Sequence, residues 1–197
     1  MKKLTVQASH PYDIEIESGL LAQCGQRIRT VSDARQVMVV TDTHVSPLYL
    51  GAVCASLRES GFTISSCAFP AGEQTKNLQN VSALYDMLAE KEFTRSDLLV
   101  ALGGGVIGDL TGFAAATFLR GMDFVQIPTT LLAQVDSSVG GKTGVNIESG
   151  KNLVGAFKQP RLVLCDPAVL STLPETVFAD GMAEVIKYGC IKSLSLF

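Results

Sequence analysis

The sequence has few charged residues and few histidines, and both shortages exclude classes of function. Charged side chains make up 18% of the 197 residues, the formal net charge is -3, and the lysines and arginines form no basic run. A nucleic-acid-binding surface needs clustered cations to neutralise phosphates, so we expect no nucleic-acid partner. The two histidines, His10 and His44, lack the spacing of metal ligands. A hydrophobic content of 47% nevertheless allows a well-filled core.

Cysteine pairs and a secretion signal are also absent. The five cysteines are an odd number without a C-x-x-C pair, which favours reduced, mostly buried thiols over a disulfide scaffold or a zinc knuckle. Polar residues follow Met1, Lys2 and Lys3 where a signal peptide would have an apolar stretch. Residues 98–119 are long and apolar, but adjacent glycines and Asp109 favour a buried strand and helix over a membrane span. The sequence thus predicts a cytoplasmic protein with no membrane partner.

Strand and helix patterns alternate along most of the chain. The expected strands are residues 5–6, 13–17, 36–41, 62–69, 98–102, 123–127 and 162–165. The expected helices are residues 19–29, 47–60, 77–91, 106–119 and 129–135. This alternation predicts an α/β fold, with a Rossmann-like, mostly parallel sheet that has helices on both faces.

From Pro174 onward the pattern stays helical and has almost nothing in the chain to pack against. We therefore expect residues 1–172 to form the α/β domain and residues 173–197 to begin an all-α domain of a longer protein.

A buried apolar strand followed by three glycines is the most informative segment. Residues 98–102 are all apolar, as in a strand buried on both faces of a parallel sheet, and Gly103, Gly104 and Gly105 follow directly. Glycines allow a tight turn and the close approach of a ligand, and a helix from Val106 would direct free N–H groups at it. Such a turn suits a pyrophosphate. Taken alone, it is equally well explained as a tight turn with no ligand.

Polar residues also follow the neighbouring strands. Asp42 ends one strand, residues 70–76 follow the next, and Thr129 and Thr130 come after the strand at 123–127. Each of these segments also has an ordinary explanation. Asp42 and the two threonines could simply cap helices, and residues 70–76 could be an ordinary charged loop. However, the carboxyl ends of parallel strands meet at one edge of a sheet, where ligands bind in open α/β folds. We expect these segments to converge there.

Two further segments carry candidate catalytic groups. Residues 136–152 form a glycine-rich polar loop that is not a P-loop, because Asp136 stands where the first glycine belongs. Its lysines suit a small, anionic, polyhydroxylated substrate, although exposed lysines usually only solvate a surface. In the helix that follows, Glu184 and Lys187 share a face, either as a plain salt bridge or as one metal ligand beside a substrate-binding ammonium. Glu184 alone cannot hold a metal.

In order along the chain, these segments resemble the 3-dehydroquinate synthase family. The matching stretches are Leu102–Ala115, Gln126–Leu132, Gln134–Thr143, Gly150–Asn152 and Ala183–Gly189. The resemblance implies a cytoplasmic, homodimeric lyase of the shikimate pathway that converts 3-deoxy-D-arabino-heptulosonate 7-phosphate to 3-dehydroquinate and phosphate. It also implies recycled NAD and a divalent metal, zinc or cobalt. Another NAD-dependent sugar-phosphate cyclase and a bare NAD-binding domain are the alternatives.

The glycine turn and the resemblance together give expected roles to single residues. The expected NAD contacts are Asp42, Gly72, Glu73, Lys76, Gly103, Gly104, Gly105, Val106, Asp109, Thr129, Thr130, Lys142, Lys151, Val169, Leu170, Ser171 and Thr172. The expected substrate-binding and catalytic residues are Arg120, Asp136, Lys142, Asn152 and Lys187. Arg120 is expected to reach the substrate phosphate of a partner subunit. Glu184 matches the first metal ligand, and both histidine ligands belong to a second domain that this chain lacks.

Overall fold

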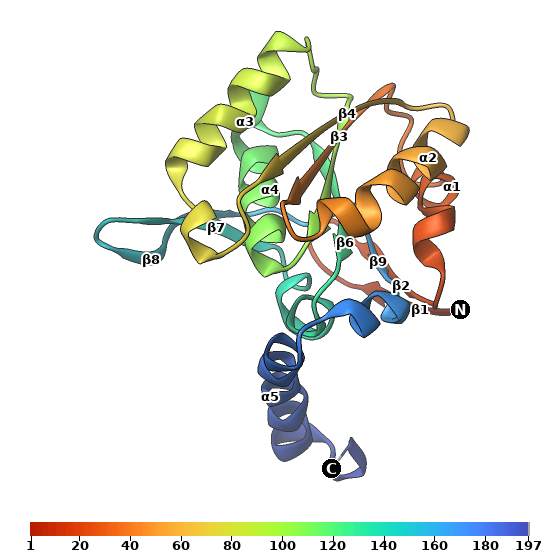
Figure 1. The fold of residues 1–197 in the computed structure, drawn as a ribbon, viewed down its shortest axis with the longest axis vertical. Coiled ribbons are helices and arrows are strands. Elements are labelled where there is room, and N and C mark those ends of the chain that lie inside the picture. The colour runs from red at the N-terminus through yellow and green to blue at the C-terminus, as the bar shows by residue number, and fades with distance from the viewer. Residues whose placement is uncertain (197) are drawn as a thin grey trace.

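A seven-stranded sheet forms the centre of the protein, in a computed structural model that describes residues 1–196 (Figure 1). The strand order is β1-β2-β9-β6-β5-β3-β4. Strand β1 is antiparallel to β2, and the other neighbouring pairs are parallel. The strands are β1 (Lys2–Val6), β2 (Tyr12–Ile16), β3 (Gln36–Asp42), β4 (Thr63–Phe69), β5 (Leu98–Gly103), β6 (Asp123–Pro128) and β9 (Leu162–Cys165).

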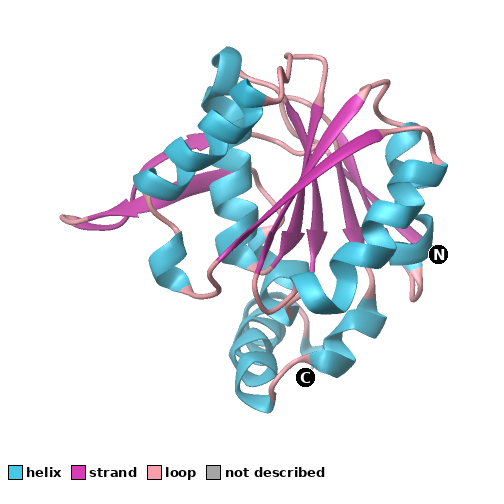
Figure 2. Ribbon diagram, turned by 45° about the horizontal axis from the view of Figure 1, so that its top comes forward, coloured by secondary structure: helices cyan, strands magenta, loops and turns pink. Residues whose placement is uncertain are grey.

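Helices cover both faces of this sheet (Figure 2). They are α1 (Cys24–Arg29), α2 (Gly51–Glu59), α3 (Leu78–Glu90) and α4 (Gly105–Thr117). Short 3-10 helices span Leu20–Gln23, Glu73–Thr75, Phe118–Arg120, Pro167–Thr172 and Leu194–Leu196, and π-helical turns span Ser46–Leu50 and Ala133–Ser137. The predicted α/β fold is therefore confirmed.

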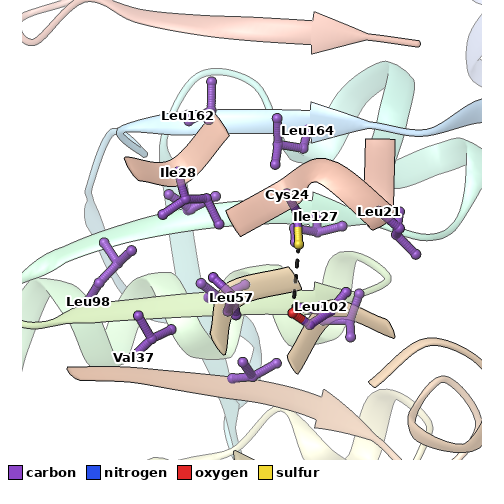
Figure 3. Packing of buried hydrophobic residues seen from close by; sticks show 14 of the residues in the cluster. Leu21, Cys24, Ile28, Val37, Leu57, Leu98, Leu102, Ile127, Leu162 and Leu164 are labelled. Atoms are coloured by element: carbon purple, nitrogen blue, oxygen red, sulfur yellow. Dashed lines mark hydrogen bonds between the residues drawn. The ribbon is translucent and has the colours of Figure 1, made fainter. Parts of the chain in front are cut away.

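Strand β5 lies between two hydrophobic cores, as its apolar run predicts. Leu98, Val100 and Leu102 pack with α1 and α2 on one face (Figure 3). Leu99 and Ala101 pack with α3 and α4 on the other face. Alternate side chains of a strand point to opposite faces, so a strand buried on both sides must be apolar throughout.

The segment 136–152 differs from its predicted form as a polar loop. Residues from Lys142 on form a hairpin of β7 (Lys142–Ile147) and β8 (Gly150–Phe157), which lies against α3 and α4 (Figure 1). Val145 is buried in the core beside α4, and this burial holds the hairpin in place. Glycines along both strands interrupt the alternation of apolar and polar residues by which a strand is recognised in a sequence.

Helix α5 (Glu175–Lys192) extends away from the sheet (Figure 1). It meets the turn at Ala133–Ser137, and Gly181 permits the approach because a Cβ there would lie 2.6 Å from the amide nitrogen of Leu132. The helix expected from Pro174 is thus present, and Phe197 lies outside the described residues. Within residues 1–196 no helix is both long and apolar enough to cross a membrane. The five cysteines, all described, are free thiols. The expectation that most are buried is wrong, because only Cys24 and Cys165 are buried, while Cys54 and Cys67 are half-buried and Cys190 is exposed.

Candidate functional site

The first turn of α4 presents free backbone N–H groups at the carboxyl edge of the sheet. Gly104 is the N-cap residue, and no side chain caps the helix. A Cβ on Gly104 would lie 3.0 Å from Thr130 Cγ2, and one on Gly105 would lie 2.9 Å from Ser137 Oγ. An added methyl group at either position would therefore press on a neighbouring side chain, so glycine keeps the turn open. The uncapped N–H groups and the positive end of the helix dipole suit a phosphate, so this turn fits the pyrophosphate of NAD.

The polar residues at the neighbouring strand ends have different roles in the structure. Asp42 Oδ1 accepts hydrogen bonds from the backbone N–H groups of His44 (2.8 Å) and Val45 (2.9 Å), so this carboxylate caps its own turn. Thr130 Oγ1 accepts a hydrogen bond from the Ala133 N–H at 3.2 Å, which is the capping role that its ordinary explanation predicts. Thr129 is buried, and its hydroxyl has no hydrogen-bond partner among residues 1–196. The hydroxyls of Thr41, Thr111 and Ser138 are also buried without a partner in the described part of the chain, so Thr129 is distinguished by its place at the carboxyl edge, where its N–H donates to the Gly103 carbonyl.

A buried ion pair joins the loop after β4 to the second turn of α4. Lys76 Nζ lies 2.6 Å from Asp109 Oδ2, and the two side chains are 6% and 22% exposed. Burial raises the pKa of the Asp109 carboxyl above its ordinary value, and the Lys76 ammonium lowers that pKa by a smaller amount. Glu73 lies in the same loop, and Gly72 before it has a φ of 114°, which favours glycine. The pair fixes this loop against α4.

A cavity of about 550 Å³ opens between α4, the turn at Ala133–Ser137 and the β7–β8 hairpin. Four of the predicted site residues line it, namely Asp109, Asp136, Lys142 and Asn152. Its other lining residues are Ser137, Val139, Thr143, Gly144, Gly155, Ala156 and Phe157. The cavity wall thus offers two carboxylates, one ammonium and one amide, a set that suits a polyhydroxylated anion.

Helix α5 reaches this cavity through Asp136. The Tyr188 hydroxyl donates a hydrogen bond to Asp136 Oδ1 at 2.7 Å, and this bond raises the pKa of Tyr188. Lys187 pairs with Glu184, which raises the pKa of the lysine, and its ammonium lies 4.8 Å from the centre of the Tyr188 ring. The plain salt bridge is therefore present. Among residues 1–196 no three side chains of metal-ligating type cluster, so the donors of this chain do not by themselves fit a metal.

Several predicted site residues lie away from the cavity. Arg120 is exposed in the short turn Phe118–Arg120 that follows α4, beyond the end of the helix opposite the glycine turn. From Gly105 to Thr117 the helix itself is about 18 Å long at 1.5 Å per residue. Lys151 is exposed on the hairpin. Val169 packs its side chain into the core, while its carbonyl accepts a hydrogen bond from the Tyr49 hydroxyl. The remaining residues of that segment, which follows β9 at the carboxyl edge, are Leu170, Ser171 and Thr172.

The sequence did not point to two residues that organise the site. Asn146 contacts both the loop after β4 and the far strand of the hairpin, and Tyr188 holds Asp136. Asn146 lay in a segment expected to be a loop, where a polar residue needs no explanation. Tyr188 lies one residue after Lys187, but nothing in the sequence indicates its partner.

Residues 66–180 match the N-terminal family of 3-dehydroquinate synthase. The chain belongs to this family. The 3-dehydroquinate synthase of Streptococcus pneumoniae (strain ATCC 700669 / Spain 23F-1) is 54% identical over 188 residues, which cover 95% of this chain and 53% of the relative. The chain therefore spans about half the length of the curated synthases it matches.

Two solved structures have the same architecture. A 2-deoxy-scyllo-inosose synthase complexed with carbaglucose-6-phosphate, NAD+ and Co2+ gives a TM-score of 0.88 at 28% identity, over 94% of this chain and 50% of that one. A 2-epi-5-epi-valiolone synthase from Streptomyces hygroscopicus subsp. jinggangensis 5008, with NAD+ and Zn2+ bound, gives 0.85 at 30% identity, over 97% and 52%. The predicted family and fold are confirmed.

Proposed function

We propose that this chain is the part of a 3-dehydroquinate synthase that binds NAD and one side of a small anionic sugar phosphate. The complete enzyme would convert 3-deoxy-D-arabino-heptulosonate 7-phosphate to 3-dehydroquinate and phosphate in the cytoplasm. The observation that carries this proposal is the cavity wall, where Asp109, Asp136, Lys142 and Asn152 meet beside the first turn of α4. The 54% identity to a 3-dehydroquinate synthase supports it.

The carboxyl edge of the sheet would hold the cofactor. The N–H groups of Gly105 and Val106 would donate to the pyrophosphate, and Thr129 offers a buried hydroxyl that needs a partner. The Lys76–Asp109 pair would fix the loop after β4 beside the bound nucleotide. NAD, when bound, would take a hydride from one carbinol of the substrate and later return it. The two solved relatives with bound NAD+ support this cofactor.

The cavity residues would bind and orient the substrate. Lys142 would neutralise an anionic group, and the Asn152 amide would bond to a hydroxyl or a carboxylate. Asp136 would accept a hydrogen bond from a substrate hydroxyl while Tyr188 holds its other side. Gly144 and Gly155 of the hairpin also line this cavity. Lys187 lies close enough to this carboxylate to act at the same place.

The roles proposed for Glu184 and Arg120 need residues from outside this chain. Glu184 would supply one carboxylate to a zinc or cobalt site completed elsewhere in a longer protein. Residues 1–172 would form the NAD-binding domain, and residues 173–197 would begin the helical one. Arg120 is exposed and does not line the cavity of its own chain, which fits a homodimer in which it serves the partner's substrate.

A different sugar-phosphate cyclase is the second candidate. Its basis is the shared fold, with a TM-score of 0.88 to 2-deoxy-scyllo-inosose synthase, but the sequence identity is 28% there and 54% with the pneumococcal synthase. Fold likeness does not separate these activities, since sites differ within one fold. The third candidate, a bare NAD-binding domain, makes no use of the cavity.

Calorimetric titration of NAD into this chain tests the cofactor site. Gly104→Ala should raise the Kd about tenfold, because the added methyl group presses on Thr130 and narrows the approach to the turn. Gly51→Ala is the matched control, since a Cβ at Gly51 meets nothing within 4 Å. Equal Kd values for all three proteins would contradict the proposed site. Phosphate release by the full-length protein, supplied with each candidate sugar phosphate, separates the synthase from the other cyclases.

A further inference from the structure

Asn146 lies where the ladder of the β7–β8 hairpin is irregular. Val145 pairs with Val154 and Ile147 pairs with Gly150, so three residues of β8 lie opposite Asn146 alone. Asn152 is the middle residue of these three, and its φ of 58° places it in the left-handed region. Such bulges occur beside active sites, where they re-aim a side chain. Here the bulge turns Asn152, which lines the cavity.

Three hydrogen bonds connect Asn146 to two separate parts of the site. Its Nδ2 donates to Glu73 Oε1 at 2.8 Å, and its backbone N–H donates to the Lys76 carbonyl at 2.8 Å. Its Oδ1 accepts a hydrogen bond from the Asn152 N–H at 2.9 Å. One amide side chain therefore holds the loop after β4 with its nitrogen and the bulge of β8 with its oxygen.

We propose that Asn146 is a positioning residue that couples the NAD loop at Glu73–Lys76 to the substrate-binding amide of Asn152. This inference rests on the proposed function, because it assigns NAD to one end of the coupling and the sugar phosphate to the other. A shift of Glu73 pulls on the Asn146 amide, and the same amide fixes the backbone turn that aims Asn152. When NAD fixes the loop at Glu73, the Asn146 amide therefore also fixes the backbone turn that positions Asn152 for the sugar phosphate.

The chemistry of the position requires an amide of this length. Aspartate would keep the acceptor for Asn152 but would bring a second negative charge against Glu73. Like charges at this distance repel, and the donor to Glu73 would also be lost. An amide at Glu73 would reverse the polarity of the bond and restore it. Glu73→Gln should therefore rescue Asn146→Asp. It would not do so if Asn146→Asp acted only by destabilising the hairpin.

The test measures the NAD Kd of this chain by calorimetry and, in the full-length enzyme, the KM for the sugar phosphate at saturating NAD. Asn146→Asp should raise both constants about tenfold. In a Glu73→Gln background the same substitution should change either constant by less than about twofold. Asn77→Asp is the matched control, since it also places a charge next to Lys76 and removes an amide donor to this loop, here the donor to the Gln74 carbonyl. It keeps the acceptor for the Asn80 N–H and makes no bond to Glu73 or Asn152, so it should leave the KM for the sugar phosphate unchanged.

Two results would overturn the inference. The first is that Asn146→Asp leaves both constants unchanged, whether or not the melting temperature falls. The second is that Glu73→Gln gives no rescue. If Asn146→Asp does not fold, Glu73→Ala at saturating NAD replaces it, and an unchanged KM for the sugar phosphate would count against the coupling. If the unmutated chain binds no NAD, the proposed function itself fails.

Discussion

Gly112 allows α4 and the β7–β8 hairpin to approach closely, and Gly112→Ala should separate them. A Cβ at this position would lie 2.4 Å from Thr143 Cγ2 and 3.1 Å from Phe124 Cζ, well inside van der Waals contact. Overpacking of this kind costs about 1–3 kcal/mol, while alanine in a helix interior regains up to about 1 kcal/mol over glycine. We expect a net loss of about 1–2 kcal/mol, which lowers the melting temperature by about 2–8 °C in a chain of this size.

Thermal and urea unfolding of this chain measure that loss, and two further variants isolate its cause. Gly51→Ala, with open space around the new methyl group, should be neutral or slightly stabilising. Thr143→Ser removes the clashing Cγ2 but keeps the hydroxyl that donates to the Ala156 carbonyl, so it should restore most of the stability in the Gly112→Ala background. If Gly112→Ala is as stable as Gly51→Ala, or if Thr143→Ser gives no recovery, the packing argument is refuted.

Two further predictions concern charge. In the full-length enzyme, Lys142→Ala or Lys187→Ala should lower kcat/KM about a hundredfold, or about 2.7 kcal/mol, with little change in melting temperature. Near-normal turnover together with reduced stability would show that these lysines are structural. The pKa of Asp109 is raised above its ordinary 3.8, so the stability that its protonation contributes is present below pH 3.8 and is lost as the pH rises through the folded-state pKa. Asp109→Asn does not titrate, so its stability relative to the unmutated chain should rise as the pH increases from 3.8 through the folded-state pKa of Asp109. A constant difference in urea midpoints would contradict this.

The position of the sheet edge proposed for the cofactor follows from the sequence, because it depends on local patterns and on topology. The apolar run before Gly103 predicts a strand buried on both faces, and both cores are present around it. Because the strands are parallel, Asp42, Lys76 and Thr129 must lie at one edge of the sheet, independently of the contacts that their side chains make. The sequence alone does not decide those contacts, and the structure gives Asp42 the capping role.

The hairpin and its connections could not be read from the sequence. Gly144, Gly150 and Gly155 interrupt the alternation of β7 and β8, so the apolar residue Val145 gives no strand signal by itself. The hydrogen bond from Asn146 to Glu73 joins residues 73 positions apart, and it exists only because the hairpin packs against α4. Long-range contacts of this kind depend on the assembled fold, so they cannot be predicted from the local secondary-structure propensity of the sequence.

Helix α4 fixes the distance between the two halves of the proposed site. Its first turn carries Gly105 at the cofactor edge, the next carries Asp109 at the cavity, and the third carries Gly112 against the hairpin. At 1.5 Å per residue these positions are spaced about 6 Å and then about 4.5 Å along one rigid axis. The distance from a bound pyrophosphate to the hairpin wall is therefore set by one helix and does not vary with the loops. An insertion within α4 would put the site out of register, whereas insertions in the surrounding loops would leave this spacing intact.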